Sequence, residues 1–75
     1  MSRTQYEVRV SGRMSERAQH AFGDYCDIRI VPAPPETIIY VGVVDQAHLQ
    51  GILHLLANLG LTLVSLNQLP NMENQ

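Results

Sequence analysis

Alternation of apolar and polar residues near the start of the chain predicts a half-buried strand over residues 5–12. Every second residue there is apolar, at Tyr6, Val8 and Val10, and the residues between them are polar. A period of two is typical of a strand with one face on a core. Gly12 closes the segment and permits a turn, because glycine adopts backbone conformations that other residues avoid.

The next segment changes to helical spacing. Ser15 is a typical N-cap residue, and Glu16 follows in the first turn, where the helix dipole favours a carboxylate. Apolar residues then recur on one face, at Ala18, Ala21, Phe22 and Tyr25. We expect a helix of two to three turns that ends at Gly23-Asp24.

Two further strands are expected, joined by a proline-rich loop. Alternation of Cys26, Ile28 and Ile30 with polar residues predicts a second half-buried strand. Residues 32–36 contain three prolines and are expected to form a loop, because proline cannot donate a hydrogen bond to a strand ladder. Residues 37–44 are apolar on both sides, which is typical of a strand in the centre of a sheet.

The most regular pattern occupies residues 45–69. Asp45 is a typical N-cap, and Gly60 stands where a helix commonly stops. Between them one apolar stripe at helical spacing comprises Leu49, Ile52, Leu53, Leu56 and Leu59. Residues 61–69 then read as an apolar strand, and Pro70 ends it.

The element order is therefore βαββαβ, and the fold class that we expect is α+β. Right-handed crossovers around a central hairpin give a ferredoxin-like sandwich with a four-stranded antiparallel sheet and both helices on one face. The first and third strands are then central, and the last is an edge. We expect a single domain over residues 1–75, with an ordered core of about residues 5–69 and flexible tails at 1–4 and 70–75.

The last strand lacks the usual protections of an edge, because residues 61–69 contain no charge and no proline. We expect a homodimer, formed by pairing of this edge or by packing of the open sheet faces. The expected interface residues are Leu61, Leu63, Val64 and Leu66. The alternative is a shorter strand over which the C-terminal tail folds.

Composition excludes several classes of function. Of 75 residues 45% are hydrophobic, the net charge is −2, and the five basic residues are scattered arginines. Nucleic-acid binding requires clustered positive charge, and RNA recognition on such a sheet requires exposed aromatics, so we expect no nucleic-acid partner. No apolar run approaches the roughly 18 residues of a membrane span, and the single Cys26 suits a reducing compartment. We expect a cytoplasmic protein without a membrane association, but with a possible protein partner.

Candidate binding residues lie on the sheet face opposite the helices. Arg9, Arg29 and Tyr40 are expected to share this face and to suit a small anion or an acidic peptide. The alternative is a solvated face with cross-strand ion pairs. The three histidines lack metal-ligand spacing, so we expect no metal and no cofactor, and no catalytic residue stands out. Cys26 is expected to be a buried, inert thiol.

Several motifs carry a resemblance. These motifs are Arg9–Arg13, Ser15-Glu16-Arg17, Asp45-Gln46-Ala47, Leu49, Gly51 and Gly60-Leu61. In them the chain resembles a group of short, uncharacterised actinobacterial proteins. This resemblance implies the same fold and a bacterial setting. Residues 55–66 also look like the second helix and last strand of ACT domains, which are regulatory modules that bind small molecules. The chain departs from ACT domains at residues 11–14, where those domains carry a Pro-Gly turn.

Three functions follow as hypotheses. The favoured one is a small non-catalytic interaction or assembly module that associates with itself. The second is an ACT-like small-molecule-binding regulatory domain. The third is a small dimeric enzyme on a ferredoxin-like scaffold, for which a histidine in a deep pocket is the feature to seek.

Overall fold

The computed structural model describes residues 3–70 and has the βαββαβ order that the sequence predicts. Its elements are β1 (Thr4–Ser11), α1 (Glu16–Tyr25), β2 (Ile28–Ala33), β3 (Glu36–Val43), α2 (Gln46–Asn58) and β4 (Leu63–Gln68). Of the expected flexible tails, residues 1–2 and 71–75 lie outside the described residues. Thr4 was placed in the first tail, but it opens β1 and pairs with Val43 of β3.

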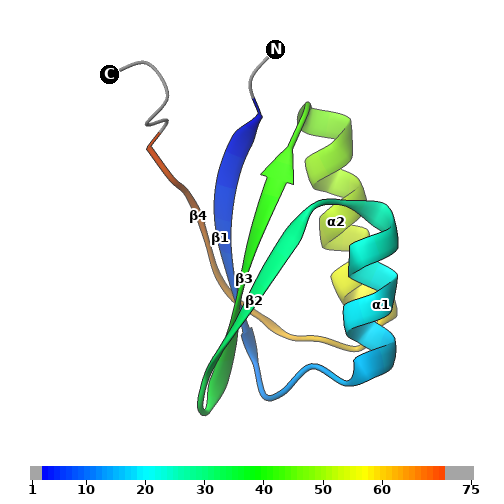
Figure 1. Ribbon diagram of the computed structural model, residues 1–75, viewed down its shortest axis with the longest axis vertical. Helices are drawn as coiled ribbons and strands as arrows, with labels where there is room; N and C mark the ends of the chain where they lie inside the picture. The colour runs from blue at the N-terminus through cyan, green and yellow to red at the C-terminus, as the bar shows by residue number, and fades with distance from the viewer. Residues whose placement is uncertain (1–2, 71–75) are drawn as a thin grey trace.

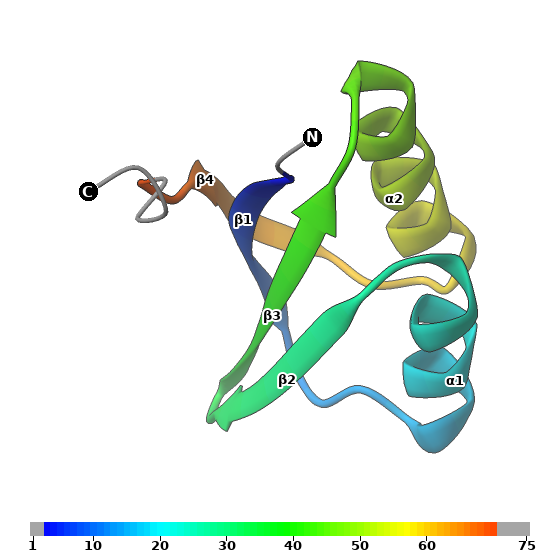
Figure 2. The same cartoon turned by 45° about the horizontal axis from the view of Figure 1, so that its top comes forward.

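The four strands form one antiparallel sheet in the order β2-β3-β1-β4. Both helices lie on the same side of this sheet (Figures 1 and 2). This is the expected α+β, ferredoxin-like sandwich. The prediction that the first and third strands are central is confirmed, and β2 and β4 are the edges.

The core lies between the helices and one face of the sheet. Its largest fully buried side chains are Phe22, Ile39, Ile52, Val8, Val10 and Val41. They come from β1, α1, β3 and α2, so the two central strands and both helices share one core. In the expected stripe of α2, Leu49, Ile52 and Leu56 are buried, and Leu53 and Leu59 are partly buried against them.

Both helices begin and end as their cap residues predict, with one exception. Ser15 Oγ accepts the Ala18 N–H at 3.1 Å, and Asp45 Oδ1 accepts the His48 N–H at 2.8 Å. Gly60 follows α2 with φ +73°, a conformation that glycine adopts without strain. The exception is α1, which continues through the expected stop at Gly23-Asp24 to residue 25.

The later end of α1 changes the position of Cys26. This residue was expected to start a strand, but it is the C-cap of α1, and β2 begins only at Ile28. The Cys26 thiol donates to the Phe22 carbonyl at 3.6 Å. Partial burial raises the pKa of this thiol, because desolvation disfavours the thiolate.

The expected loop over residues 32–36 is also wrong at both ends, because β2 includes Pro32 and Ala33 and β3 begins at Glu36. The reason lies in the pairing of β2 with β3. The Gly42 N–H donates to the Asp27 carbonyl at 3.2 Å, and hydrogen-bonded pairs alternate along an antiparallel ladder. The main-chain groups of Ile28, Ile30 and Pro32 therefore point away from β3. Proline is tolerated there because no donor is required.

Candidate functional site

The outer edge of β4 is the first candidate site, because its main chain lacks a partner strand within residues 3–70. The Leu69 N–H donates to the Gln5 carbonyl of β1 at 2.8 Å. By the same alternation, Ser65 and Asn67 face β1, whereas the N–H and C=O groups of Leu66 and Gln68 point outward. A register shift opposite Arg9 and Val10 interrupts the ladder near the start of β4, and the stretch from residue 65 to residue 68 is regular.

The four expected interface residues divide into two pairs. Leu63 and Val64 are 43% and 48% exposed, whereas Leu61 and Leu66 are partly buried against the core. The strand is also shorter than the expected 61–69, because residues 61 and 62 form an extended connection from α2. The edge nevertheless contains no charged residue and no proline between its ends. In Figure 1 it forms the margin of the sheet on the side away from β2.

The open sheet face is the second candidate site. The strand registers place all three expected binding residues on it, but Arg9 does not line the hollow that Arg29 and Tyr40 line. Arg9 forms ion pairs with two carboxylates, at 3.7 Å from its Nε to Glu7 Oε1 and at 3.4 Å from its Nη1 to Glu36 Oε1. The pair with Glu36 crosses from β1 to β3 and is of the kind that the sequence left as the alternative for this face, whereas Glu7 lies on the same strand as Arg9.

Arg29 and Tyr40 lie together, as neighbours across β2 and β3. The Arg29 guanidinium carbon lies 5.1 Å from the centroid of the Tyr40 ring, in reach of a cation–π interaction. Both residues line a hollow of about 470 Å³ at one end of the open face, together with Gly42 and Leu69. Two of the three residues that the sequence proposed, Arg29 and Tyr40, thus share one hollow, and Arg9 does not line it.

Another depression, of about 260 Å³, contains one of the histidines. The Tyr25 and His48 rings meet there with centroids 5.3 Å apart, and the Cys26 side chain lies on the same rim. His48 Nδ1 accepts the Val44 N–H at 3.2 Å, so one ring nitrogen is committed to the start of α2. Tyr25 requires the absence of a side chain at Gly51, because a β-carbon there would overlap its hydroxyl.

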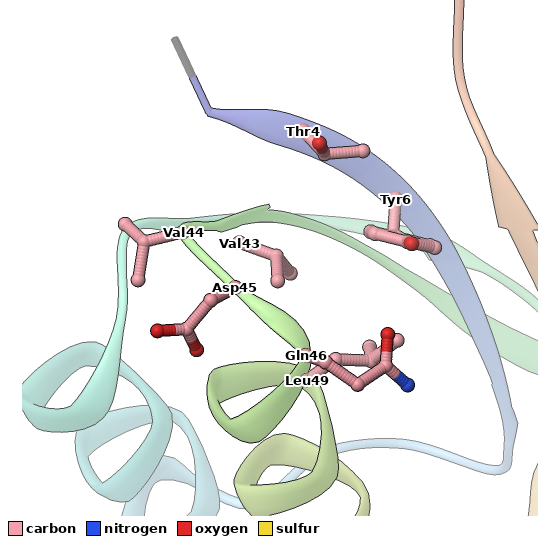
Figure 3. Close-up of a pocket in the computed structure, with 7 residues that line it drawn as sticks. All are labelled: Thr4, Tyr6, Val43, Val44, Asp45, Gln46 and Leu49. Atoms are coloured by element: carbon pink, nitrogen blue, oxygen red, sulfur yellow. The ribbon is translucent and has the colours of Figure 1, made fainter. Parts of the chain in front are cut away.

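A third cleft, of about 130 Å³, lies where β1 begins and α2 starts (Figure 3). Thr4 and Tyr6 contribute from β1, and Asp45 and Leu49 from the start of α2. The Asp45 carboxylate already accepts the His48 N–H. The one carboxylate that lines this cleft therefore caps α2 and is already hydrogen-bonded.

The part of the chain that the structure describes shows neither a metal cluster nor a helix suited to a membrane. Residues 3–70 hold no cluster of three or more histidine, cysteine or carboxylate side chains arranged for a metal ion. In the same range, neither helix has the length and apolar character that a membrane crossing requires. His20 and His54 are exposed on the helices.

The sequence reasoning missed Gly42 and Leu69, which shape the hollow beside Tyr40. A signal for Gly42 was present, because it is the only glycine in the otherwise apolar strand β3. Glycine inside a strand often marks a place where another group approaches the backbone. No comparable signal marked Leu69, whose position follows from the pairing of β4 with β1.

Comparison with known families gives one match. A family model described as "Domain of unknown function (DUF8691)" matches residues 5–67, which span all six elements except the last residue of β4 and the first of β1. No curated protein and no solved structure matches the chain. The resemblances to actinobacterial proteins and to ACT domains remain predictions.

Proposed function

The chain belongs to the DUF8691 family, and we propose that it is an interaction module that pairs with a second copy of itself through the outer edge of β4. The observation that carries this proposal is the composition and exposure of that edge. Within residues 3–70 the outward main-chain groups of Leu66 and Gln68 have no partner strand, and they lie next to the exposed side chains of Leu63 and Val64. Unpaired edge groups of this kind are a template for another strand.

A second copy of the chain is the binding partner that suits the β4 edge best. When two identical edge strands pair antiparallel about a two-fold axis, each outward donor meets an acceptor on the same strand of the other copy. A charged edge would oppose such pairing, since like charges would face each other. The strand β4, with the sequence LVSLNQ, carries no charge and meets this requirement.

The dimer is expected to dissociate on dilution. Each new main-chain hydrogen bond contributes about 1 kcal/mol, and completing the burial of a half-exposed leucine or valine contributes about as much. Association costs roughly 4–15 kcal/mol in lost freedom. A six-residue edge provides gains of a size similar to this cost, so the expected affinity is micromolar or weaker.

Light scattering coupled to size-exclusion chromatography tests the proposal over a dilution series. The mass is expected to rise from 8.4 kDa toward twice that value as the concentration increases. Hydrogen exchange locates the contact, because the outward amides of Leu66 and Gln68 gain protection only when the dimer forms. The outward amides of Ile28 and Ile30 on β2 serve as the internal control.

Two lysine substitutions test whether the dimer depends on the β4 edge or on any exposed apolar residue. Val64→Lys places a charge on β4 and is expected to weaken the dimer by at least about tenfold, because two like charges then approach each other. Val44→Lys is the matched control, since Val44 is 60% exposed but lies between β3 and α2.

Two results would contradict the proposal. One is equal weakening by Val64→Lys and Val44→Lys, and the other is a monomer at every concentration. A monomer would direct the search to a different protein that covers β4.

A further inference from the structure

The hollow on the open sheet face lies beside Gly42 of β3, whose missing side chain leaves room for two side chains of the N-terminal strand region. A β-carbon at Gly42 would lie 3.3 Å from both Arg3 Cδ and Gln5 Nε2, which is closer than ordinary van der Waals contact. Arg3, Gln5 and Gly42 together line one side of a space of about 470 Å³, with Tyr40 on the same strand as Gly42 and Leu69 across β1. This volume lies within the range of small-molecule sites, about 300–1,000 Å³.

The charges around the hollow leave one arginine without a carboxylate. Asp27 forms an ion pair with Arg3, and Glu7, which neighbours Tyr40 across the strands, forms one with Arg9. Among the described residues, Arg29 has no carboxylate partner, and its guanidinium lies over the Tyr40 ring. The ionised groups that line the hollow thus carry one excess positive charge, in a chain whose net charge is −2.

We propose that this hollow binds a small organic carboxylate with a flat apolar body. The guanidinium of Arg29 presents donors in a planar fork that matches a carboxylate. The Tyr40 ring and the Leu69 side chain provide apolar contacts for the body of the ligand. Pockets of this kind combine mainly apolar walls with a few polar groups that orient the ligand.

The site is independent of the dimer proposed above. Edge pairing at β4 uses main-chain groups in the plane of the sheet, whereas the hollow opens from the sheet face. Ligand binding and self-association can therefore each fail without the other.

Titration of the ¹⁵N-labelled chain with benzoate, followed by NMR, tests the proposal. Benzoate is expected to shift the amide signals of Tyr40, Gly42 and Leu69 with a dissociation constant of roughly millimolar order, as for a small fragment. Benzamide keeps the ring and lacks the charge, and acetate keeps the charge and lacks the ring. Each is expected to bind at least about fivefold more weakly, because the proposed site uses both parts.

Two arginine variants of the same sheet face provide the matched comparison. Arg29→Gln is expected to weaken benzoate binding by at least about tenfold. Arg9→Gln removes an arginine that is already paired with Glu7 and Glu36, so binding is expected to remain within about twofold. The amide spectrum of each variant shows whether the fold is retained.

A third variant narrows the hollow without altering charge. Gly42→Ala introduces a β-carbon that crowds Arg3 Cδ and Gln5 Nε2 at 3.3 Å, so these side chains must move. Because both line the hollow, the variant is expected to reduce benzoate binding by about fivefold or more. The proposal is overturned if benzamide binds as well as benzoate, if the two arginine variants lose binding equally, or if the shifts map away from the hollow or never occur.

Discussion

Both edges of the sheet expose main-chain groups to which another strand can pair, and the two edges differ in how far their residues prevent this pairing. On β2 the outward main-chain positions are Ile28, Ile30 and Pro32, so one donor is missing and a proline ring occupies the edge. On β4 the corresponding positions include Leu66 and Gln68, and both retain their N–H groups. The strand β2 also carries a charge at Arg29, whereas β4 carries none.

This difference explains why association is expected at one edge only. A proline or a charge on an edge strand blocks the addition of another strand, and natural sheets use both devices. A protein with two unprotected edges would add copies at both ends and form open-ended assemblies, whereas one unprotected edge limits growth to a closed dimer. The contrast between β2 and β4 therefore bears on the size of the assembly as well as on its location.

The largest effect is expected from proline substitutions at two adjacent, exposed positions of β4. Asn67→Pro removes a donor that faces β1, so it is expected to destabilise the fold by about 2 kcal/mol or more. Gln68→Pro removes a donor that faces outward, so it is expected to leave stability within about 1 kcal/mol and to weaken the dimer at least about tenfold. Urea unfolding of dilute protein measures the first effect, and light scattering the second.

These two variants control for each other, because they share the new residue and the exposed setting. If Gln68→Pro unfolded the chain as much as Asn67→Pro, the assignment of inward and outward groups on β4 would be wrong. If Gln68→Pro left the dimer intact, the contact would lie elsewhere on the molecule.

A second prediction removes the protection of β2. Arg29→Thr and Pro32→Val together remove the charge of β2 and restore a donor at an outward position, and both new residues favour strands. With both edges then able to pair, we expect species larger than a dimer at concentrations where the natural sequence stops at two copies. Analytical ultracentrifugation measures this distribution. The triple variant that adds Gln68→Pro is the control, and it is expected to return to a closed dimer through β2.

The fold was predictable wherever local pattern and long-range packing agree. The stripe from Leu49 to Leu59 and the caps at Ser15 and Asp45 are local signals, and the structure confirms them. Pro32 shows where local reasoning failed. Proline excludes a residue only from positions that must donate, and whether position 32 donates depends on its pairing with β3.

The candidate site was predictable only in part, for a similar reason. Placing Arg29 and Tyr40 on one sheet face required only the alternation of side chains along each strand. The separation of Arg9 from them depends on its ion pairs with Glu7 and Glu36, which alternation does not reveal. Gly42 contributes to the hollow through the side chain that it lacks, because this leaves room for Arg3 and Gln5, so it escapes any search for functional groups.

The smallest expected effect is that of salt on the dimer, and it distinguishes the two modes of association that the sequence left open. Pairing at β4 joins two uncharged strands, and salt weakens only interactions between charges. The dissociation constant of the dimer is therefore expected to change by less than about twofold between low and high sodium chloride. Packing of the open faces would bring Arg9, Arg29 and their partner carboxylates against the same charges of a second copy. That contact would respond to salt by much more. Sedimentation at several salt concentrations measures the slope, with Arg29→Gln as the control, because removing this charge leaves the slope unchanged only if the dimer forms at β4.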